Sequence, residues 1–136
     1  MKNKIVVRSL DEMLKLGIGL SKIITPGDII YLEGNLGAGK TTLVKSILQA
    51  LGYNGSVKSP TYTLVEEYRV HKHIIYHYDL YRLSDPEELE WLGVRDNFNG
   101  TSISFIEWPV KGIGYLPKPT KVISIEYDDL NRIIYF

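Results

Sequence analysis

The stretch that decides the fold is Gly34-Asn35-Leu36-Gly37-Ala38-Gly39-Lys40-Thr41. It fits the pattern G-x-x-x-x-G-K-[ST], in which backbone amides surround phosphate groups. An apolar segment, residues 28–33, precedes it, and residues 40–51 carry apolar side chains at helical spacing before Gly52. The motif therefore lies between a predicted strand and a predicted helix, the context that a phosphate-binding loop requires.

Each residue type in this loop has a chemical reason. Glycine lets the chain turn sharply and lets backbone N–H groups approach phosphate oxygens, while the helix N-terminus adds partial positive charge. Lys40 is expected to reach the β- and γ-phosphates, Thr41 to place its hydroxyl on Mg²⁺, and Thr42 to offer another hydroxyl to the phosphates. The residues expected to surround the nucleotide are Asn35, Leu36, Gly37, Ala38, Gly39, Lys40, Thr41 and Thr42. A dinucleotide-binding fingerprint is excluded because it needs glycine or alanine at position 42.

The remaining elements follow from periodicity and turn residues. A strand is expected over 4–8, a helix from the capping box of Ser9 and Glu12, and an antiparallel strand pair over 62–70 and 73–80. A short helix from 85, a strand over 102–107, a loop over 110–119 and a hairpin of 121–127 with 132–136 complete the chain. These elements predict an α/β, P-loop NTPase-like three-layer fold with a mixed parallel and antiparallel sheet, in one domain spanning 1–136.

Composition narrows the setting. The 136 residues include 16 basic and 16 acidic side chains and no cysteine, so disulfides and cysteine metal sites are excluded. No apolar run is long enough to cross a bilayer, and we expect a cytoplasmic protein without a membrane partner. Because the charges balance, the chain has no global attraction for nucleic acid. If RNA is involved, a partner is expected to do most of the binding.

Two acids end apolar runs and are candidates for the chemistry beyond binding. Glu107 follows 103–106, and Asp79 follows 74–78, with His77 on the same strand face as Asp79. Either acid can hold Mg²⁺ through water while the other orients the attacking water. The alternative for each is a solvated charge at a strand end.

Three histidines, His71, His73 and His77, share one parity along the predicted strand. A strand separates His73 from His77 by roughly 13 Å at about 3.3 Å per residue, too far for one tetrahedral zinc ion. We therefore expect no zinc site, and interpret His71 and His73 as polar residues of a hairpin.

Three further residues have two readings each. Thr61, in Ser59-Pro60-Thr61, is a candidate sensor of the γ-phosphate and its metal, or a loop threonine entering a strand. Trp108 can cover the nucleotide or fill the core. Arg82 can contact phosphate or form a surface ion pair, and its chemistry favours the surface pair.

These residues assemble into four blocks in a fixed order, which closely resemble the TsaE (YjeE) family. The blocks are 34–42, Ser59 to Tyr68, His77-Tyr78-Asp79-Leu80-Tyr81-Arg82-Leu83 and Ile106-Glu107-Trp108-Pro109. The blocks after the glycine-rich loop are the more specific ones. Tyr62 stands where phenylalanine is frequent in the family, and Val110 where a polar or acidic residue is expected.

The resemblance implies a Mg²⁺-dependent ATPase that binds ATP or ADP and supports threonylcarbamoyl transfer to adenosine 37 of tRNA. It implies the TsaB and TsaD proteins as partners, with tRNA contacted indirectly, and turnover that is weak alone and stimulated in the complex. By motif match, Lys40, Thr41 and Thr42 carry over as phosphate and metal ligands, and Thr61 as a switch-like threonine. Asp79 and Glu107 carry over as the acidic pair, and Trp108 as a residue near the nucleotide. Adenine is favoured because the guanine signature Asn-Lys-x-Asp is absent from the sequence.

Two rival functions stay open from the sequence. A small-molecule kinase would need an acceptor pocket and usually an arginine-rich lid, and Arg82, Arg95 and Arg132 do not cluster in the sequence. A nucleotide-dependent binding module would dock in its ATP state without obligatory turnover.

Overall fold

The computed structural model describes residues 3–35, 37–71 and 73–136. Its strands and helices are β1 (Lys4–Val7), α1 (Leu10–Ser21), β2 (Ile29–Glu33), α2 (Lys40–Leu51), β3 (Val65–Val70), β4 (His73–Asp79), α3 (Glu88–Trp91), β5 (Ile103–Glu107), β6 (Lys121–Asp128) and β7 (Asn131–Tyr135). Two short 3₁₀ helices, η1 (Val94–Asn97) and η2 (Pro109–Gly112), lie in the connections on either side of β5. No helix of this part of the chain has both the length and the apolar character needed to span a bilayer.

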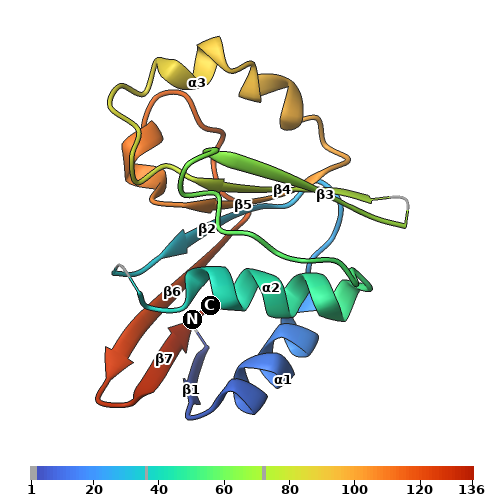
Figure 1. Ribbon diagram of the computed structural model, residues 1–136, viewed down its shortest axis with the longest axis vertical. Helices are drawn as coiled ribbons and strands as arrows, with labels where there is room; N and C mark the ends of the chain where they lie inside the picture. The colour runs from blue at the N-terminus through green and yellow to red at the C-terminus, as the bar shows by residue number, and fades with distance from the viewer. Residues whose placement is uncertain (1–2, 36, 72) are drawn as a thin grey trace.

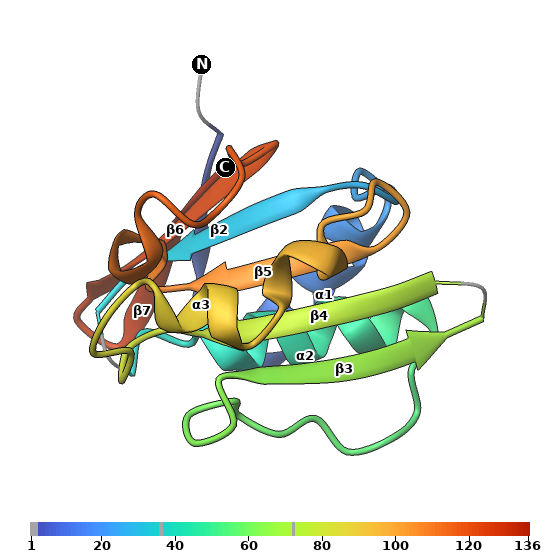
Figure 2. The same cartoon turned by 90° about the horizontal axis from the view of Figure 1, so that it is seen from above.

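The strands form one sheet in the order β1-β7-β6-β2-β5-β4-β3. The pairs of β2 with β5, β2 with β6 and β4 with β5 are parallel, while the pairs towards both edges are antiparallel. Helices α1 and α2 lie on one side of the sheet, and α3 lies on the other (Figure 1). Seen from above, β3, β4 and β5 run side by side across α2 (Figure 2). The prediction of an α/β fold with a mixed sheet is therefore confirmed.

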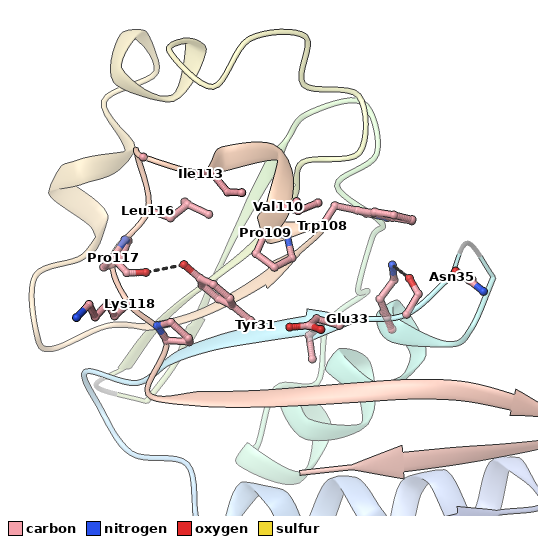
Figure 3. Close-up of a pocket in the computed structure, with 15 residues that line it drawn as sticks. Tyr31, Glu33, Asn35, Trp108, Pro109, Val110, Ile113, Leu116, Pro117 and Lys118 are labelled. Carbon is pink, nitrogen blue, oxygen red and sulfur yellow. Dashed lines mark hydrogen bonds between the residues drawn. The ribbon is translucent and has the colours of Figure 1, made fainter.

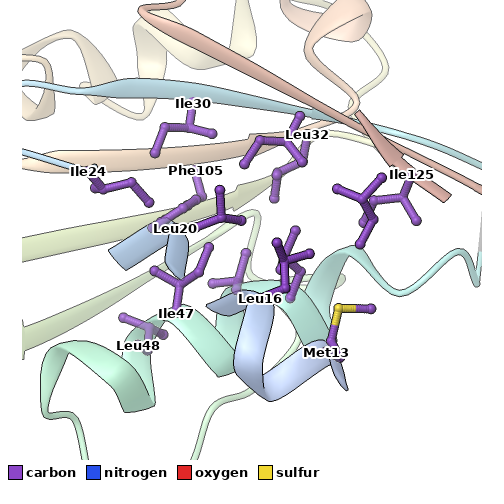
Figure 4. Close-up of a cluster of buried hydrophobic side chains, with 14 of the residues drawn as sticks. Met13, Leu16, Leu20, Ile24, Ile30, Leu32, Ile47, Leu48, Phe105 and Ile125 are labelled. Carbon is purple, nitrogen blue, oxygen red and sulfur yellow. The ribbon is translucent and has the colours of Figure 1, made fainter. Parts of the chain in front are cut away.

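The side of the sheet that faces α1 and α2 carries the larger core. Leu16 and Leu20 of α1 and Ile47 of α2 meet buried strand residues such as Ile30 and Phe105 (Figure 4). The two helices touch closely at Gly17, where an added Cβ would lie 2.5 Å from the Ser46 Cβ. A glycine at this position therefore sets the helix spacing and holds α2 in place against the sheet.

One strand boundary differs from its prediction by more than one residue. The strand expected over 62–70 begins at Val65, because residues 61–64 form a turn in which the Leu64 N–H donates to the Pro60 carbonyl at 2.9 Å. Leu64 has a positive φ of 67°, which a strand does not accept. The β-branched and aromatic composition of 62–64 favours a strand locally, and the turn overrides it.

The carboxyl ends of the parallel strands meet at one edge of the sheet. In register, Glu107 of β5 lies opposite Asp79 of β4 on one side and Leu32 of β2 on the other. The chain leaves β2 at Glu33 and enters α2 through the glycine-rich loop. Loops that follow parallel strands at such an edge commonly hold ligands in open α/β sheets, and the predicted site residues gather there.

Candidate functional site

The glycine-rich loop fits against the sheet only without side chains at certain positions. At Gly34, an added Cβ would lie 2.7 Å from the backbone oxygen of Ile125, so the loop passes directly over β6. Gly39 has a φ of 107° and precedes α2 without a side-chain cap on the helix. The first N–H groups of α2 therefore lack a side-chain acceptor, which is the arrangement that suits an anionic ligand.

The β6–β7 hairpin holds the outside of this loop. The Tyr127 hydroxyl donates to the Gly37 carbonyl, and Arg132 Nε donates to the Ala38 carbonyl at 2.9 Å. The Arg132 guanidinium also lies 4.0 Å from the centroid of the Tyr127 ring. The sequence analysis missed both residues, because their partners Gly37 and Ala38 lie 90 and 94 residues earlier in the chain and are brought close only when the sheet forms.

Lys40 is the buried cation of the site, with 4% of its surface exposed. Its Nζ donates to the Gly34 carbonyl at 2.6 Å and lies 4.1 Å from the centroid of the Trp108 ring. Burial lowers the pKa of the Lys40 ammonium, and the charges of Glu107 and Asp79 act against that shift. The ammonium group is thus poorly solvated and lacks a directly bonded anion among the described residues, so it is suited to attract one.

Glu107 joins α2 to the central strands. Its Oε2 accepts a hydrogen bond from the Thr41 hydroxyl at 3.2 Å, and the side chain is buried. Thr41 and Glu107 are therefore neighbours, as expected if both serve the same metal ion.

Asp79 ends β4 beside Glu107 in register and is 8% exposed. Burial raises the pKa of its carboxyl, against a hydrogen bond from the Tyr81 N–H to Oδ1 at 3.0 Å. The Glu107 charge raises the pKa further, while Lys40 and His77 lower it. The second oxygen of Asp79 has no hydrogen bond among the described residues and remains available to a ligand.

His77 makes a contact with Glu107 that was not predicted from the sequence. The ring is fully buried, and its Nε2 lies 2.5 Å from Glu107 Oε2. The sequence signal for this contact was the shared strand face of His77 and Asp79. The pairing of β4 with β5 brings that face beside Glu107. His71 and His73 are exposed, in agreement with their interpretation as hairpin residues.

These side chains line a cavity of about 280 Å³, which we call the loop cavity. It brings the second half of the glycine-rich loop together with both acids and with the segment that follows α2. Thr61 is half-buried there, and its hydroxyl lies 2.6 Å from the Ser59 hydroxyl. The lining residues are Gly37, Ala38, Gly39, Lys40, Thr41, Thr42, Ser59, Thr61, Asp79, Glu107 and Trp108.

A second cavity of about 600 Å³, the apolar cavity, adjoins the loop cavity at Lys40 and Trp108. Asn35 and Gly34 also line it, and Tyr31, Pro109, Val110, Ile113 and Leu116 supply most of its apolar wall (Figure 3). Its other charged lining residues are Glu33 and Lys118. Trp108 lines both cavities, and its ring packs on Tyr81 with ring centroids 5.0 Å apart.

The predictions for Leu36 and Arg82 are not confirmed. Leu36 was predicted to contact the nucleotide, and it lies outside the described residues. Arg82 was expected to form a surface ion pair, and no such pair is found for it among the residues described. Its guanidinium instead lies 4.6 Å from the centroid of the Tyr62 ring, which is 83% exposed. Tyr62, the aromatic residue that departs from the family pattern, thus packs against the Arg82 guanidinium.

Comparison with known proteins agrees with this geometry. The family model "Threonylcarbamoyl adenosine biosynthesis protein TsaE" matches residues 7–134. A TsaE protein of Haemophilus influenzae is 58% identical over 106 residues, covering 78% of this chain and 67% of the relative. A TsaE protein of Rickettsia conorii is 39% identical over 127 residues, covering 93% and 72%.

Among solved structures, the crystal structure of Bacillus subtilis YdiB matches with a TM-score of 0.83 at 30% identity. The match covers 100% of this chain and 84% of YdiB, and it confirms the predicted P-loop NTPase-like fold. The fold, the four sequence blocks and the family match agree, and the chain belongs to the TsaE family of threonylcarbamoyl adenosine biosynthesis proteins.

Proposed function

We propose that this chain binds ATP with Mg²⁺ in the loop cavity and hydrolyses it to ADP and phosphate in support of tRNA threonylcarbamoyladenosine modification. The observation that carries the proposal is the convergence of Lys40, Thr41, Asp79 and Glu107 on one cavity of about 280 Å³. These four residues come from α2 and from the ends of β4 and β5. A buried ammonium group, a helix N-terminus and two carboxylates are the groups that bind a nucleoside triphosphate and its metal ion.

The residues present fit a phosphate chain. The start of α2 has no side-chain cap at Gly39, and the Lys40 ammonium is close to the loop, bonded to the Gly34 carbonyl at 2.6 Å. A phosphate oxygen is a stronger acceptor for an ammonium group than a neutral carbonyl. We therefore expect Lys40 to leave the Gly34 carbonyl for the phosphates.

Glu107 and Asp79 make different contacts, which support different roles. Glu107 accepts from the Thr41 hydroxyl, so the pair would hold Mg²⁺ from one side, with Thr41 as direct ligand. Asp79 keeps one oxygen free of hydrogen bonds to the described residues, and in our proposal it accepts a proton from the attacking water or orients that water. Bound Mg²⁺ would neutralise phosphate charge, and Thr61 would contact the terminal phosphate from the other wall.

The proposed partners are TsaB and TsaD, with tRNA reached through that complex. Support comes from family membership and from the balanced charge of the chain, 16 basic against 16 acidic side chains. A protein without a strong positive field binds RNA weakly by itself. An accessory ATPase docked on a protein complex does not need that field.

A reconstitution tests this function. Purified TsaB, TsaD, threonylcarbamoyl-adenylate and tRNA are combined with and without this chain and ATP, and modified tRNA is counted per TsaD. We expect several turnovers only when both the chain and ATP are present. Equal product without the chain, or with Lys40→Ala in its place, would remove hydrolysis from the proposed function.

The apolar cavity favours a second candidate, a small-molecule kinase. It offers about 600 Å³ directly beside Lys40, which is enough for a metabolite to accept a phosphoryl group. However, none of Arg82, Arg95 and Arg132 lines it, so the arginine-rich lid of many kinases is not built here from the described residues. Radiolabelled γ-phosphate appearing in a metabolite of a cell extract, and not in inorganic phosphate, would favour this candidate over the ATPase.

A further inference from the structure

His77 is the one fully buried histidine of the described chain, and it touches the site through Glu107. Its Nε2 and the Thr41 hydroxyl both face the same carboxylate oxygen, Oε2, at 2.5 Å and 3.2 Å. The carboxylate therefore has one oxygen held from β4 and α2 together, and no hydrogen bond from a described residue is found for its other oxygen. Three elements of the fold meet at this one group.

The two ring nitrogens of His77 differ in their surroundings. Nδ1 is buried and has no hydrogen-bond partner among the described residues, whereas Nε2 faces the Glu107 carboxylate. A carboxylate oxygen accepts hydrogen bonds, so Nε2 carries a proton and donates to Glu107.

Glu107 stands at the end of β5, and His77 is the one side chain of the sheet that bonds to it among the residues that the structure describes. Its other contact is with the Thr41 hydroxyl of α2, and the metal ion would also need that hydroxyl as a ligand. Partners that hold a metal-side carboxylate in one rotamer commonly change metal affinity or activity by 10–100-fold when removed.

We propose that His77 is a positioning residue that fixes the Glu107 carboxylate beside Thr41 for Mg²⁺-nucleotide binding and turnover. The inference rests on the proposed nucleotide site. In this role His77 contacts neither the nucleotide nor the attacking water, and acts only through Glu107.

The test compares His77→Leu with His73→Leu, the same change at an exposed histidine of the same strand. Calorimetric titration with ADP is carried out in saturating Mg²⁺ and in EDTA. For His77→Leu we expect unchanged ADP affinity in EDTA, loss of about tenfold of the Mg²⁺-dependent gain in affinity, and about tenfold lower kcat with little change in KM. His73→Leu should match the wild type in every assay.

Two more variants separate positioning from packing. His77→Gln places an amide N–H donor at a similar distance from the backbone and should restore most of kcat and of the Mg²⁺ effect. In a Glu107→Gln background, His77→Leu should cost little more, because the group it positions is already changed. Should His77→Leu not fold, His77→Asn replaces it, since its shorter amide does not reach Glu107.

The outcomes are distinguishable from failure of the proposed function. Wild-type protein that binds no ADP in Mg²⁺ would overturn the nucleotide site itself. Wild-type binding with a normal Mg²⁺ effect in His77→Leu, or a His77→Gln variant as poor as His77→Leu, would overturn the positioning role alone.

Discussion

The ammonium group of Lys40 lies 4.1 Å from the centroid of the Trp108 ring, so the buried cation of the glycine-rich loop touches the residue that follows Glu107. Trp108 has a positive φ of 57°, an uncommon conformation for a large side chain, which directs the chain from β5 into η2. The contact couples the loop to a residue that lines both cavities. Any ligand that draws Lys40 away also changes the surroundings of the indole.

Trp108 should therefore report nucleotide binding. The chain has two tryptophans, and Trp91 is 82% exposed on α3. In a Trp91→Phe variant, we expect ADP to change the remaining indole fluorescence, because the ammonium group leaves the ring face. A Trp108→Phe variant should show no such change. A nucleotide-dependent signal that comes from Trp91 alone would contradict this coupling.

Lys40→Ala should abolish measurable hydrolysis, with at least about 100-fold lower turnover, because the phosphates lose their buried positive partner. Lys40→Arg should not restore it, since the fork of a guanidinium does not fit a space formed around one ammonium group. The matched control is Lys45→Ala, at an exposed lysine of the same helix. Phosphate release and thermal melting measured together separate lost chemistry from lost folding. Wild-type turnover by Lys40→Ala would remove this residue from the site.

The two acids should fail in different ways. Glu107→Gln should raise the Mg²⁺ concentration that gives half-maximal turnover, because the Thr41 contact places it on the metal side. Asp79→Asn should lower kcat by about 100-fold with a nearly unchanged Mg²⁺ requirement, as expected for a group that handles the attacking water. Steady-state kinetics over a range of Mg²⁺ concentrations measure both effects, with Glu126→Gln, an exposed acid of β6, as control. An unaltered rate in Asp79→Asn would leave the water without its proposed partner.

Much of this site followed from the sequence, and the reasons are local. The glycine-rich loop, Lys40 and Thr41 sit in a continuous strand–loop–helix segment, so spacing alone placed them. Asp79 and Glu107 were found because each follows an apolar run and so stands at the end of a predicted strand. Their grouping with the loop is visible in the structure.

Other contacts depend on pairings that no local pattern contains. His77 reaches Glu107 only because β4 pairs with β5 in one register, and Tyr127 reaches the loop only when the β6–β7 hairpin closes beside it. The start of β3 was predicted at residue 62 and lies at Val65. Here the local composition favours a strand, and a turn around Leu64 overrides it.

Asp28 gives a pH-dependent test of the fold away from the site. Burial acts to raise the pKa of its carboxyl, and this is outweighed by hydrogen bonds from Lys121, the Thr25 amide and Thr120, so the pKa is lowered. A carboxyl with a lowered folded pKa stabilises the protein above its unfolded pKa of about 3.9, and that contribution is lost as pH falls through the folded value. Asp28→Asn should cost about 2 kcal/mol of unfolding free energy at neutral pH. The difference from wild type in urea titrations should shrink below about pH 4, and a gap independent of pH would contradict the assignment.

The helix contact at Gly17 offers a test with an internal control. Gly17→Ala places a Cβ 2.5 Å from the Ser46 Cβ and should destabilise the protein by about 1–3 kcal/mol. Gly19→Ala on the same helix meets nothing within 4 Å and should stabilise it by about 0.5–1 kcal/mol through helix propensity. Chemical unfolding of both variants measures the two free energies. Equal effects of the same sign would contradict the described packing of α1 on α2.

The most direct test of the central claim is calorimetric titration of the purified chain with ADP and with a non-hydrolysable ATP analogue in the presence of Mg²⁺. We predict saturable binding of one nucleotide per chain, which is lost in Lys40→Ala and retained in Lys45→Ala. Absence of saturable binding by the folded wild-type protein, or equal binding by Lys40→Ala, would contradict the account.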